Sequence, residues 1–501
     1  MSLPHSFTST ELSHLRLTYL NSQNLLLSVA SFVLITVAYF VISDLISPIR
    51  NYGGPTLAKY TNLWRLYHVT RGSFHKVLED VHRKYGPVVR VGPNILDVDL
   101  PEMHKTVFRT KGDWRKTELY LASSSLVNGK IMYNVFSQLD PDIHAKWKKP
   151  IAKYYSMPGV APMESHMDRT ISLLCDQLES RFMGKEAAAG QQIDLGEWIL
   201  FSMDYFAWVG TIPWLDRVLD KNPLVHIGPP SYGPITARAI KFVMDRVQGL
   251  DKEFHDSASP DYLDHFLEAK ENYPETVDDV MVISYLMINM IAGADTTASH
   301  IRAALYYSLK TPRVWKRLRQ ELDKAGLTDK GRERPLSFKE VRGIAYLEAI
   351  VRESIRFFPA LALSLERYVP PGGCQLPTGE FVAGGTKMGF NPYVICRNKD
   401  AYGEDSDVFR PERWLRDTEG GETEEGFKER LRAMNDADLT FGAGSRRCLG
   451  QHMALMQVYK VVATLAARYE IELVDKEGEW KAANSWFVRF EGFIVRMRKR
   501  E

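Results

Sequence analysis

The sequence predicts an α+β protein in which helices predominate, preceded by a single transmembrane helix near the N-terminus. Most of the chain shows the hydrophobic spacing of amphipathic helices, with apolar residues recurring at helical intervals. Strand-like runs are short and lie at residues 88–91, at residues 96–98 and near the C-terminus. Residues 25–42 form an almost wholly apolar run, long enough to cross a hydrocarbon core of ~30 Å as a helix.

The apolar N-terminal run is expected to stay in the protein as a membrane anchor. No charged residue occurs from position 17 to position 43. A cleaved secretory signal is the alternative, but the run is too long for one, Glu11 precedes it and no clear A-x-A site follows. Positive charges gather on its C-terminal side, so the positive-inside rule places the rest of the chain in the cytoplasm. These charges are Arg50, Lys59, Arg65 and Arg71, against Arg16 on the other side.

Four segments are predicted along the chain: a short N-terminal segment at 1–24, the transmembrane anchor at 25–43, a Pro/Gly linker at 44–55 and one large domain at 56–501. The linker is marked by residues that break a continuing helix, namely Pro48, Gly53, Gly54 and Pro55. The acidic, glycine-rich stretch at 417–429 is expected to form a solvated loop inside the large domain.

Charge and cysteine content argue against several classes of protein. The chain has 501 residues, with 64 Lys plus Arg and 62 Asp plus Glu, so its net charge is +2. A chain with balanced charge and no basic stripe is not expected to bind nucleic acid. None of the four cysteines forms a C-x-x-C pair or lies at zinc-finger spacing from a histidine, so structural zinc is not expected. Three of them, Cys175, Cys374 and Cys396, are expected to be buried thiols.

The fourth cysteine, Cys448, lies in the segment Phe441-Gly-Ala-Gly-Ser-Arg-Arg-Cys-Leu-Gly450. Glycines 442, 444 and 450 are expected to take positive φ and to let the backbone approach a bulky group. The pattern after Cys448 turns helical, so the thiol is predicted near a helix N-terminus, where free N–H groups stabilise a thiolate. A thiolate close to Arg446 suggests a metal cofactor that carries anionic groups. A glycine-rich turn around a buried cysteine is the alternative that these residues leave open.

This segment matches the pattern F-x-x-G-x-R-x-C-x-G at every fixed position, and from about residue 52 onward the chain resembles the cytochrome P-450 superfamily. The matching residues are Phe441, Gly444, Arg446, Cys448 and Gly450. The resemblance implies the cytochrome P-450 fold for a haem-binding catalytic domain at 56–501. It also implies that Cys448 is the axial ligand of the iron of haem b, in a segment that binds the haem.

Three further motifs of that superfamily occur earlier in the chain, in the expected order. Ala292-Gly-Ala-Asp-Thr-Thr297 lies in a helical pattern over 277–311 that Pro312 ends, and the resemblance implies that Asp295 and Thr296 deliver the protons needed to cleave the O–O bond. Glu353 and Arg356 match E-x-x-R, and residues 411–414 match P-E-R-W. In the resemblance, Arg413 joins Glu353 and Arg356 in a buried structural triad. Taken alone, the Asp–Thr pair could satisfy local backbone groups, and a Glu–Arg pair occurs by chance.

Cations for the haem propionates are placed by the same resemblance at Arg446 and Arg367, and at His144 and Lys148. The last two belong to His144-Ala-Lys-Trp-Lys148, similar to an H-x-x-x-R element, with Lys148 where arginine is usual. His144 could equally be an ordinary surface histidine. Glu366, directly before Arg367, stands where related sequences often carry proline, and the sequence offers no explanation for it.

The function that the resemblance implies is insertion of one oxygen atom from O2 into a hydrophobic small molecule. NADPH would supply the electrons through a separate flavoprotein reductase on the same membrane, because the chain contains no G-x-G-x-x-G opening a βαβ unit. Cytochrome b5 is a second candidate donor, and the endoplasmic reticulum is the expected membrane. The substrate walls are expected at 114–133, 198–214, 290–297 and 359–365 and around 486–487.

The stretches at 85–94 and 409–415 are most similar to filamentous-fungal members such as the pisatin demethylase-like group, so we expect a step of secondary-metabolite biosynthesis. Two other functions stay open at this point. A haem-thiolate isomerase or dehydratase would need neither O2 nor a reductase, and a non-catalytic haem-binding or ligand-binding protein would form no product.

Overall fold

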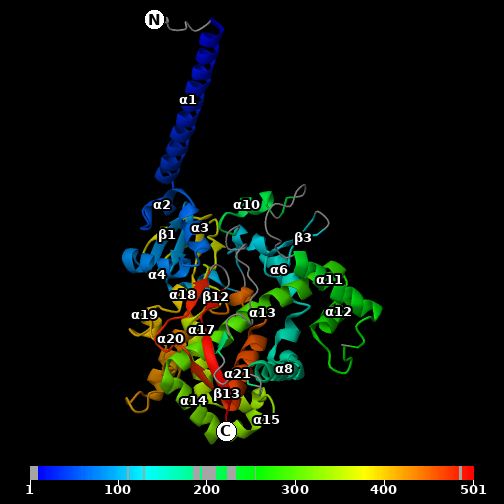
Figure 1. Ribbon diagram of the computed structural model, residues 1–501. Helices are drawn as coiled ribbons and strands as arrows, with labels where there is room; N and C mark the ends of the chain where they lie inside the picture. The colour runs from blue at the N-terminus through cyan, green and yellow to red at the C-terminus, as the bar shows by residue number, and fades with distance from the viewer. Residues whose placement is uncertain are drawn as a thin grey trace, which may run out of the picture.

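The structure is a computed structural model that describes residues 9–109, 112–127, 130–183, 192–194, 210–219, 221–222, 233–253, 255–484 and 488–500. One long helix, α1 (Ser9–Leu45), projects away from a helix-rich domain that carries a few short sheets (Figure 1). The predicted class, α+β with helices predominant, is confirmed. Of the predicted substrate walls, residues 128–129, 198–209 and 486–487 lie outside the described residues, as do residues 1–8 of the predicted N-terminal segment.

The anchor helix fits a single transmembrane span. Its apolar part, Asn24–Leu45, contains no buried residue and lies within one or two residues of the predicted boundaries. The helix itself begins much earlier than predicted, at Ser9, and the chain then packs directly on the domain. Asp44 pairs with Arg90 at 2.5 Å, and Ile49 is fully buried. Residues 44–55 are thus fixed against the first strand at several points.

The helices of the domain vary from one turn to 32 residues. They are α2 (Thr56–Tyr60), α3 (Leu63–Thr70), α4 (Phe74–Tyr85), α5 (His104–Val107), α6 (Pro141–Lys148), α7 (Met157–Val160), α8 (Glu164–Phe182), α10 (Pro213–Val218), α11 (Gly233–Gln248), α12 (Tyr262–Asn272), α13 (Asp279–Lys310), α14 (Pro312–Lys324), α15 (Leu327–Glu333), α16 (Phe338–Val341), α17 (Ala345–Phe357), α18 (Pro392–Ile395), α19 (Lys399–Tyr402), α20 (Glu424–Ala437) and α21 (Gln451–Arg468).

Helix α13 forms the centre of the domain and packs against α11, α12, α17 and α21. The Asp278 side chain caps the start of α13 by accepting a hydrogen bond from the Met281 N–H. Helix α13 ends at Lys310, and Pro312 begins α14. Helix α13 is long and apolar enough to cross a membrane, but nearly half of its most apolar window is buried by neighbouring elements, so it is a core helix.

The largest sheet has the order β1-β2-β9-β6 and lies close to the anchor (Figure 1). Only the β2–β9 pair is parallel. Its strands are β1 (Val88–Gly92), β2 (Ile95–Val98), β9 (Lys387–Gly389) and β6 (Arg367–Tyr368). Beyond β6, a single antiparallel bridge joins Arg367 to Lys116. Two residues from distant parts of the sequence are thereby brought together.

The remaining strands form small antiparallel units. A three-stranded sheet has the order β10-β13-β5 and is made by β10 (Tyr469–Leu473), β13 (Ile494–Lys499) and β5 (Gln192–Asp194). The two-stranded units are β3 (Ser125–Val127) with β4 (Lys130–Met132), β7 (Cys374–Gln375) with β8 (Phe381–Val382), and β11 (Lys481–Asn484) with β12 (Val488–Glu491). The loop predicted at 417–429 is wrong in its second half, where α20 begins because the Thr423 side chain caps it by accepting from the Gly426 N–H.

Candidate functional site

A cavity of about 420 Å³ lies between α13 and the loop that carries Cys448. On the α13 side its wall is formed by Ala292, Gly293 and Ala294, which are exposed although the helix is otherwise largely buried. Small side chains here leave room that larger ones would fill. Its volume falls in the range of roughly 300–1,000 Å³ typical of ligand pockets.

The Cys448 loop is shaped by two glycines with positive φ. Gly442 and Gly444 have φ of 67° and 61°, and a Cβ on Gly444 would lie 1.3 Å from the carbonyl oxygen of Phe108. The expectation of positive φ is wrong at Gly450, where φ is −76° because this residue leads into the right-handed helix α21 as its N-cap. The Cys448 N–H donates to the Phe441 carbonyl oxygen at 2.8 Å, which closes the loop.

Cys448 lines the cavity and is exposed only because it faces this internal space. Its depth in the protein raises the pKa of the thiol, while the backbone N–H groups of Gly450 and Gln451 and the charges of Arg447 and Lys148 act in the opposite direction. Helix α21 begins three residues after Cys448, close to the predicted start, and its first N–H groups face the sulfur.

Three basic side chains line the same cavity. Lys116 and Arg367 are 5% and 4% exposed, and Arg446 is half-buried. Among the residues that the structure describes, no carboxylate lies within ion-pair distance of any of the three. The Lys116 ammonium donates to the Phe136 carbonyl oxygen at 2.7 Å, and Arg446 donates to that of Gln138 at 2.7 Å. The site therefore brings together three buried or half-buried basic side chains that form no ion pair with a described carboxylate.

The sequence analysis did not identify Lys116 as a site residue. Burial, and then the charges of Arg367 and Arg446, lower the pKa of its ammonium well below the usual range. Burial and the charge of Arg367 likewise lower the pKa of Arg446 to about 10. No local pattern marks Lys116, because a lone lysine in a loop is usually solvated. The tertiary structure places Lys116 at the cavity, through its backbone bridge to Arg367.

His144 and Lys148, both on α6, are separated by the structure. His144 is buried, lines the cavity, and has a pKa lowered far below its usual value by burial and by the Arg446 and Lys116 charges. Lys148 does not line the cavity. Its ammonium donates to the Ser445 carbonyl oxygen at 3.0 Å and so holds the Cys448 loop from outside.

Thr296 and Asp295 also differ in their placement. Thr296 lines the cavity, and its hydroxyl donates to the Ala292 carbonyl oxygen one turn earlier, at 2.8 Å. Asp295 is buried and lies outside the cavity lining. Of the predicted segments, Phe441 and Gly450 line the cavity, whereas Gly444 packs behind it against Phe108.

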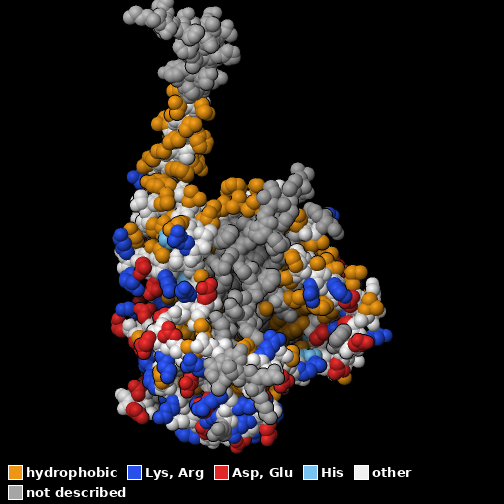
Figure 2. All heavy atoms as spheres, in the orientation of Figure 1, with side chains coloured by type: hydrophobic (Ala, Val, Ile, Leu, Met, Phe, Trp, Pro, Cys, Tyr) orange, Lys and Arg blue, Asp and Glu red, His pale blue; other side chains and the backbone are white. Residues whose placement is uncertain are grey.

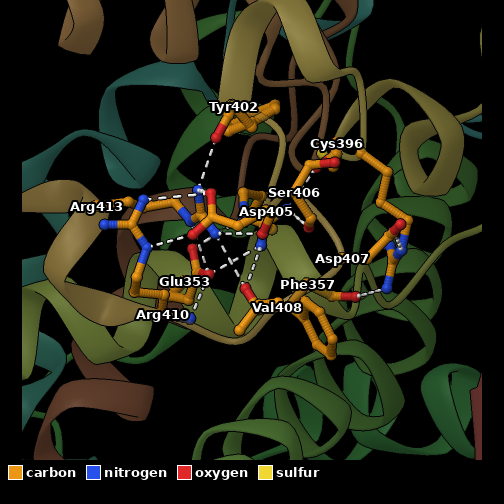
Figure 3. Close-up of polar contacts among 12 residues, drawn as sticks. Glu353, Phe357, Cys396, Tyr402, Asp405, Ser406, Asp407, Val408, Arg410 and Arg413 are labelled. Atoms are coloured by element: carbon orange, nitrogen blue, oxygen red, sulfur yellow. Dashed lines mark hydrogen bonds and ion pairs between the residues drawn. The ribbon is translucent and has the colours of Figure 1, made fainter.

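A buried ion-pair network lies beside the site (Figure 3). The fully buried Glu353 carboxylate accepts hydrogen bonds from Arg356 at 2.8 and 2.9 Å and from Arg413 at 2.9 Å. It also accepts from the Trp414 indole, a donor that the sequence analysis did not single out. Burial alone would raise the pKa of Glu353, but the two arginines outweigh it and lower that pKa.

The two arginines connect the network to the chain that leads toward the Cys448 loop. Arg356 donates to the carbonyl oxygens of Cys396 and Ser406, and Arg413 to those of Tyr402 and Val408. Figure 3 shows Arg413 and Val408 close to Glu353, with the Tyr402 carbonyl linked to Arg413. The network thus fixes residues 396–414 onto α17.

Comparisons with known proteins give one family. A family model described as cytochrome P-450 matches residues 214–495. The chain is 42% identical to the cytochrome P-450 monooxygenase cfoH of Aspergillus candidus, over 99% of this chain and 96% of that protein. It is 33% identical to the cytochrome P-450 monooxygenase cicH of Emericella nidulans, over 92% of this chain and 97% of that protein. The similarity to mpaDE' of Penicillium brevicompactum, 31% over 90% of this chain, covers 55% of that longer relative.

Proposed function

This chain belongs to the cytochrome P-450 monooxygenases, and on that premise we propose that it inserts one oxygen atom from O2 into a hydrophobic small molecule. Membership of the family implies a haem, a redox partner that supplies electrons and a small-molecule substrate. The proposal adds NADPH as the electron source, a separate flavoprotein reductase as the donor, with cytochrome b5 as a second donor, and the assignment of individual residues to the reaction.

The residues around the cavity fit a haem. Lys116, Arg367 and Arg446 supply buried positive charge that the two haem propionates would neutralise, and His144 stands beside them. Cys448 offers a thiol at the cavity wall, which as a thiolate would ligate the iron. When bound, the haem supplies the oxidising chemistry, and a thiolate ligand favours O–O cleavage. The uncompensated cations at the cavity are the observation that carries the proposal.

The protein's own part in the reaction is to supply protons and to leave room beside α13. The Thr296 hydroxyl lies at the cavity wall, where its Oγ1 would hold a proton beside the gap formed by Ala292–Ala294. Asp295, buried on the same helix, would supply that proton. Glu353, Arg356 and Arg413 take no part in the chemistry and hold the segment that leads to the Cys448 loop.

Substrate contacts would be largely apolar. The cavity is lined by hydrophobic side chains from three separate segments, which favours a hydrophobic ligand. These side chains are Val135, Phe136, Ile288, Ile291, Ala360, Leu361 and Leu365. A step in secondary-metabolite biosynthesis is part of the proposal, and the filamentous-fungal origin of the relatives is consistent with it.

The N-terminal helix anchors the protein to a membrane, and we place that membrane in the endoplasmic reticulum with the domain in the cytoplasm. Figure 2 shows hydrophobic side chains along the anchor and over the adjoining end of the domain. They include Ile46, Leu57 and Trp214, which are more than half exposed. The basic residues that follow the anchor support the orientation. A reductase on the same membrane could then reach the domain.

The first experiment is the absorption spectrum of the full chain, reduced with dithionite and exposed to carbon monoxide. We expect the strongly red-shifted Soret band of thiolate-ligated haem for the wild type and its loss in Cys448→Ala. Turnover of apolar substrates should then require NADPH and reductase together. A shifted band that survives in Cys448→Ala would overturn the ligand assignment, and product formed without NADPH or reductase would overturn the monooxygenase reaction.

A further inference from the structure

A buried ion pair involves Glu366, the residue directly before the cavity cation Arg367. Glu366 and Arg65 are 2% and 3% exposed, and the Arg65 Nη2 and Glu366 Oε1 atoms are 2.6 Å apart. The Thr117 hydroxyl donates to the other carboxylate oxygen at 2.8 Å. The Arg65 contact is one of charge and not an aligned hydrogen bond, because Oε1 has no hydrogen-bond partner among the described atoms.

Glu366 and its hydrogen-bond partner Thr117 are each next in sequence to a cavity cation. Lys116 and Arg367 are joined by a backbone bridge, and Thr117 and Glu366 are their immediate neighbours. Burial raises the pKa of Tyr120, and the negative charge of Glu366 adds to that rise. Tyr120 lines the cavity and accepts a hydrogen bond from the Arg367 guanidinium at 3.1 Å. The field of Glu366 therefore reaches the cavity wall.

A buried carboxylate in this position creates a conflict. Lys116 and Arg367 have to be available for the anionic groups of a ligand, yet Glu366, the residue directly before Arg367, is an anion that could compete for them. Charged groups in a low-dielectric interior attract strongly, and an intramolecular partner has a concentration advantage over any ligand. In the structure Glu366 is paired with Arg65, and no ion pair joins Glu366 to the described cavity cations.

We propose that Arg65 is a positioning residue that neutralises Glu366 and so keeps Lys116 and Arg367 available for the carboxylates of the haem. Arg65 is on α3, shortly after the membrane anchor and 301 positions before Glu366 in the sequence. The segment next to the membrane thus contributes to cofactor retention without touching the cofactor. The inference rests on the proposed haem site and goes beyond it by assigning a residue outside the cavity.

The test is the rate at which haem leaves the full-length holoprotein for excess apomyoglobin, compared between the wild type, three variants and a control. Arg65→Met should release haem faster by a factor on the order of ten to a hundred, the loss of one charge-assisted contact. Arg65→Lys, which keeps the charge, should stay within roughly threefold of wild type. The double variant Arg65→Met/Glu366→Gln should return close to wild type, because the competing charge is gone.

The double variant separates this role from simple packing. If Arg65 only fills space, Arg65→Met/Glu366→Gln would release haem as fast as Arg65→Met, and that result would overturn the proposal. An unchanged rate in Arg65→Met would do the same. Arg65→Gln gives the same comparison if the methionine variant does not fold. Arg468→Met, which breaks a half-buried pair with Glu179 at the far end of α21, is the matched control and should leave the rate unchanged.

The carbon monoxide spectrum of the wild type keeps the two proposals distinguishable. A wild type without the red-shifted band means that the haem-thiolate site itself is wrong. A wild type with that band, and equal haem release in all variants, means that only the role of Arg65 is wrong.

Discussion

Replacing Glu353 by glutamine should weaken the fold by an amount that the structure allows one to work out. The substitution keeps the shape of the side chain but leaves Arg356 and Arg413, which are 2% and 1% exposed, without their shared anion. An amide also turns a donor toward the Trp414 indole or the arginines, where the carboxylate only accepted. Removing one partner of a buried ion pair costs about 3–5 kcal/mol.

The expected loss converts into a measurable shift. An unfolding entropy of about 2.1 cal/mol/K per residue over roughly 450 residues gives about 0.9 kcal/mol per degree, so the melting temperature should fall by about 3–5 °C. The assay is thermal unfolding of the full chain in detergent, followed by far-UV circular dichroism at one fixed scan rate. Because the network holds the chain before the Cys448 loop, the fraction of protein with the red-shifted carbon monoxide band should fall as well.

Glu424→Gln is the matched control. Glu424 pairs with Lys428 one turn away on α20, and both are more than half exposed. An exposed pair of this kind contributes about 0.3–0.5 kcal/mol, so the control should melt within about 1 °C of wild type. If Glu353→Gln also melts within 1 °C and keeps the full spectrum, the network is not what holds residues 396–414, and the reasoning fails.

Four further outcomes follow from the structure. His75 is fully buried, and burial together with the charges of Lys76 and Arg397 lowers its pKa to about 3. Below pH 6.5, the ordinary pKa of histidine, the unfolded chain takes up a proton at His75 while the folded chain does not. The free energy of unfolding therefore decreases as the pH falls. Between pH 7 and pH 5 the wild type should therefore lose about 2 kcal/mol more than His75→Leu, seen as a melting-temperature drop about 2 °C larger, and equal drops would contradict the assignment. Gly444→Ala should prevent folding or destabilise the chain by more than about 3 kcal/mol in the same melt, because Gly444 has a positive φ and its Cβ would collide with the Phe108 carbonyl. Gly450→Ala should cost under about 1 kcal/mol, because φ is −76° and the surroundings are open. Similar losses in the two variants would show that φ and packing do not determine which glycine is required. Lys116→Met should release haem to apomyoglobin about tenfold faster, whereas the exposed Lys105→Met should not, and equal rates would remove Lys116 from the site. Thr296→Ala should bind haem normally but form more hydrogen peroxide per NADPH oxidised, Thr296→Ser should resemble wild type, and full coupling in the alanine variant would exclude Thr296 from proton delivery.

Several features could be predicted from the sequence because their signals are local. The hydrophobic pattern over 277–311 and Pro312 gave α13 to within two residues at either end. The apolar run at 25–43 predicted the transmembrane helix, because the length of a segment and its lack of charge are enough to identify one. The Cys448 loop was also predictable, because its glycines and the helix after it are contiguous. Where local signals were weak the predictions failed, as at Thr423, whose capping side chain starts α20 inside an expected loop.

Only the tertiary structure decided which charges meet. Lys116, Arg367 and Arg446 come from a loop, a strand end and the Cys448 loop. The resemblance placed Arg367 and Arg446 at the haem propionates, but nothing near Lys116 in the sequence indicates that it lines the same cavity. Glu366 was unexplained until Arg65, from the segment after the anchor, was found beside it. The physical reason is that a charge has an energetic consequence only through its burial and its partner. Both depend on contacts between residues hundreds of positions apart, which periodicity and spacing along the chain do not encode.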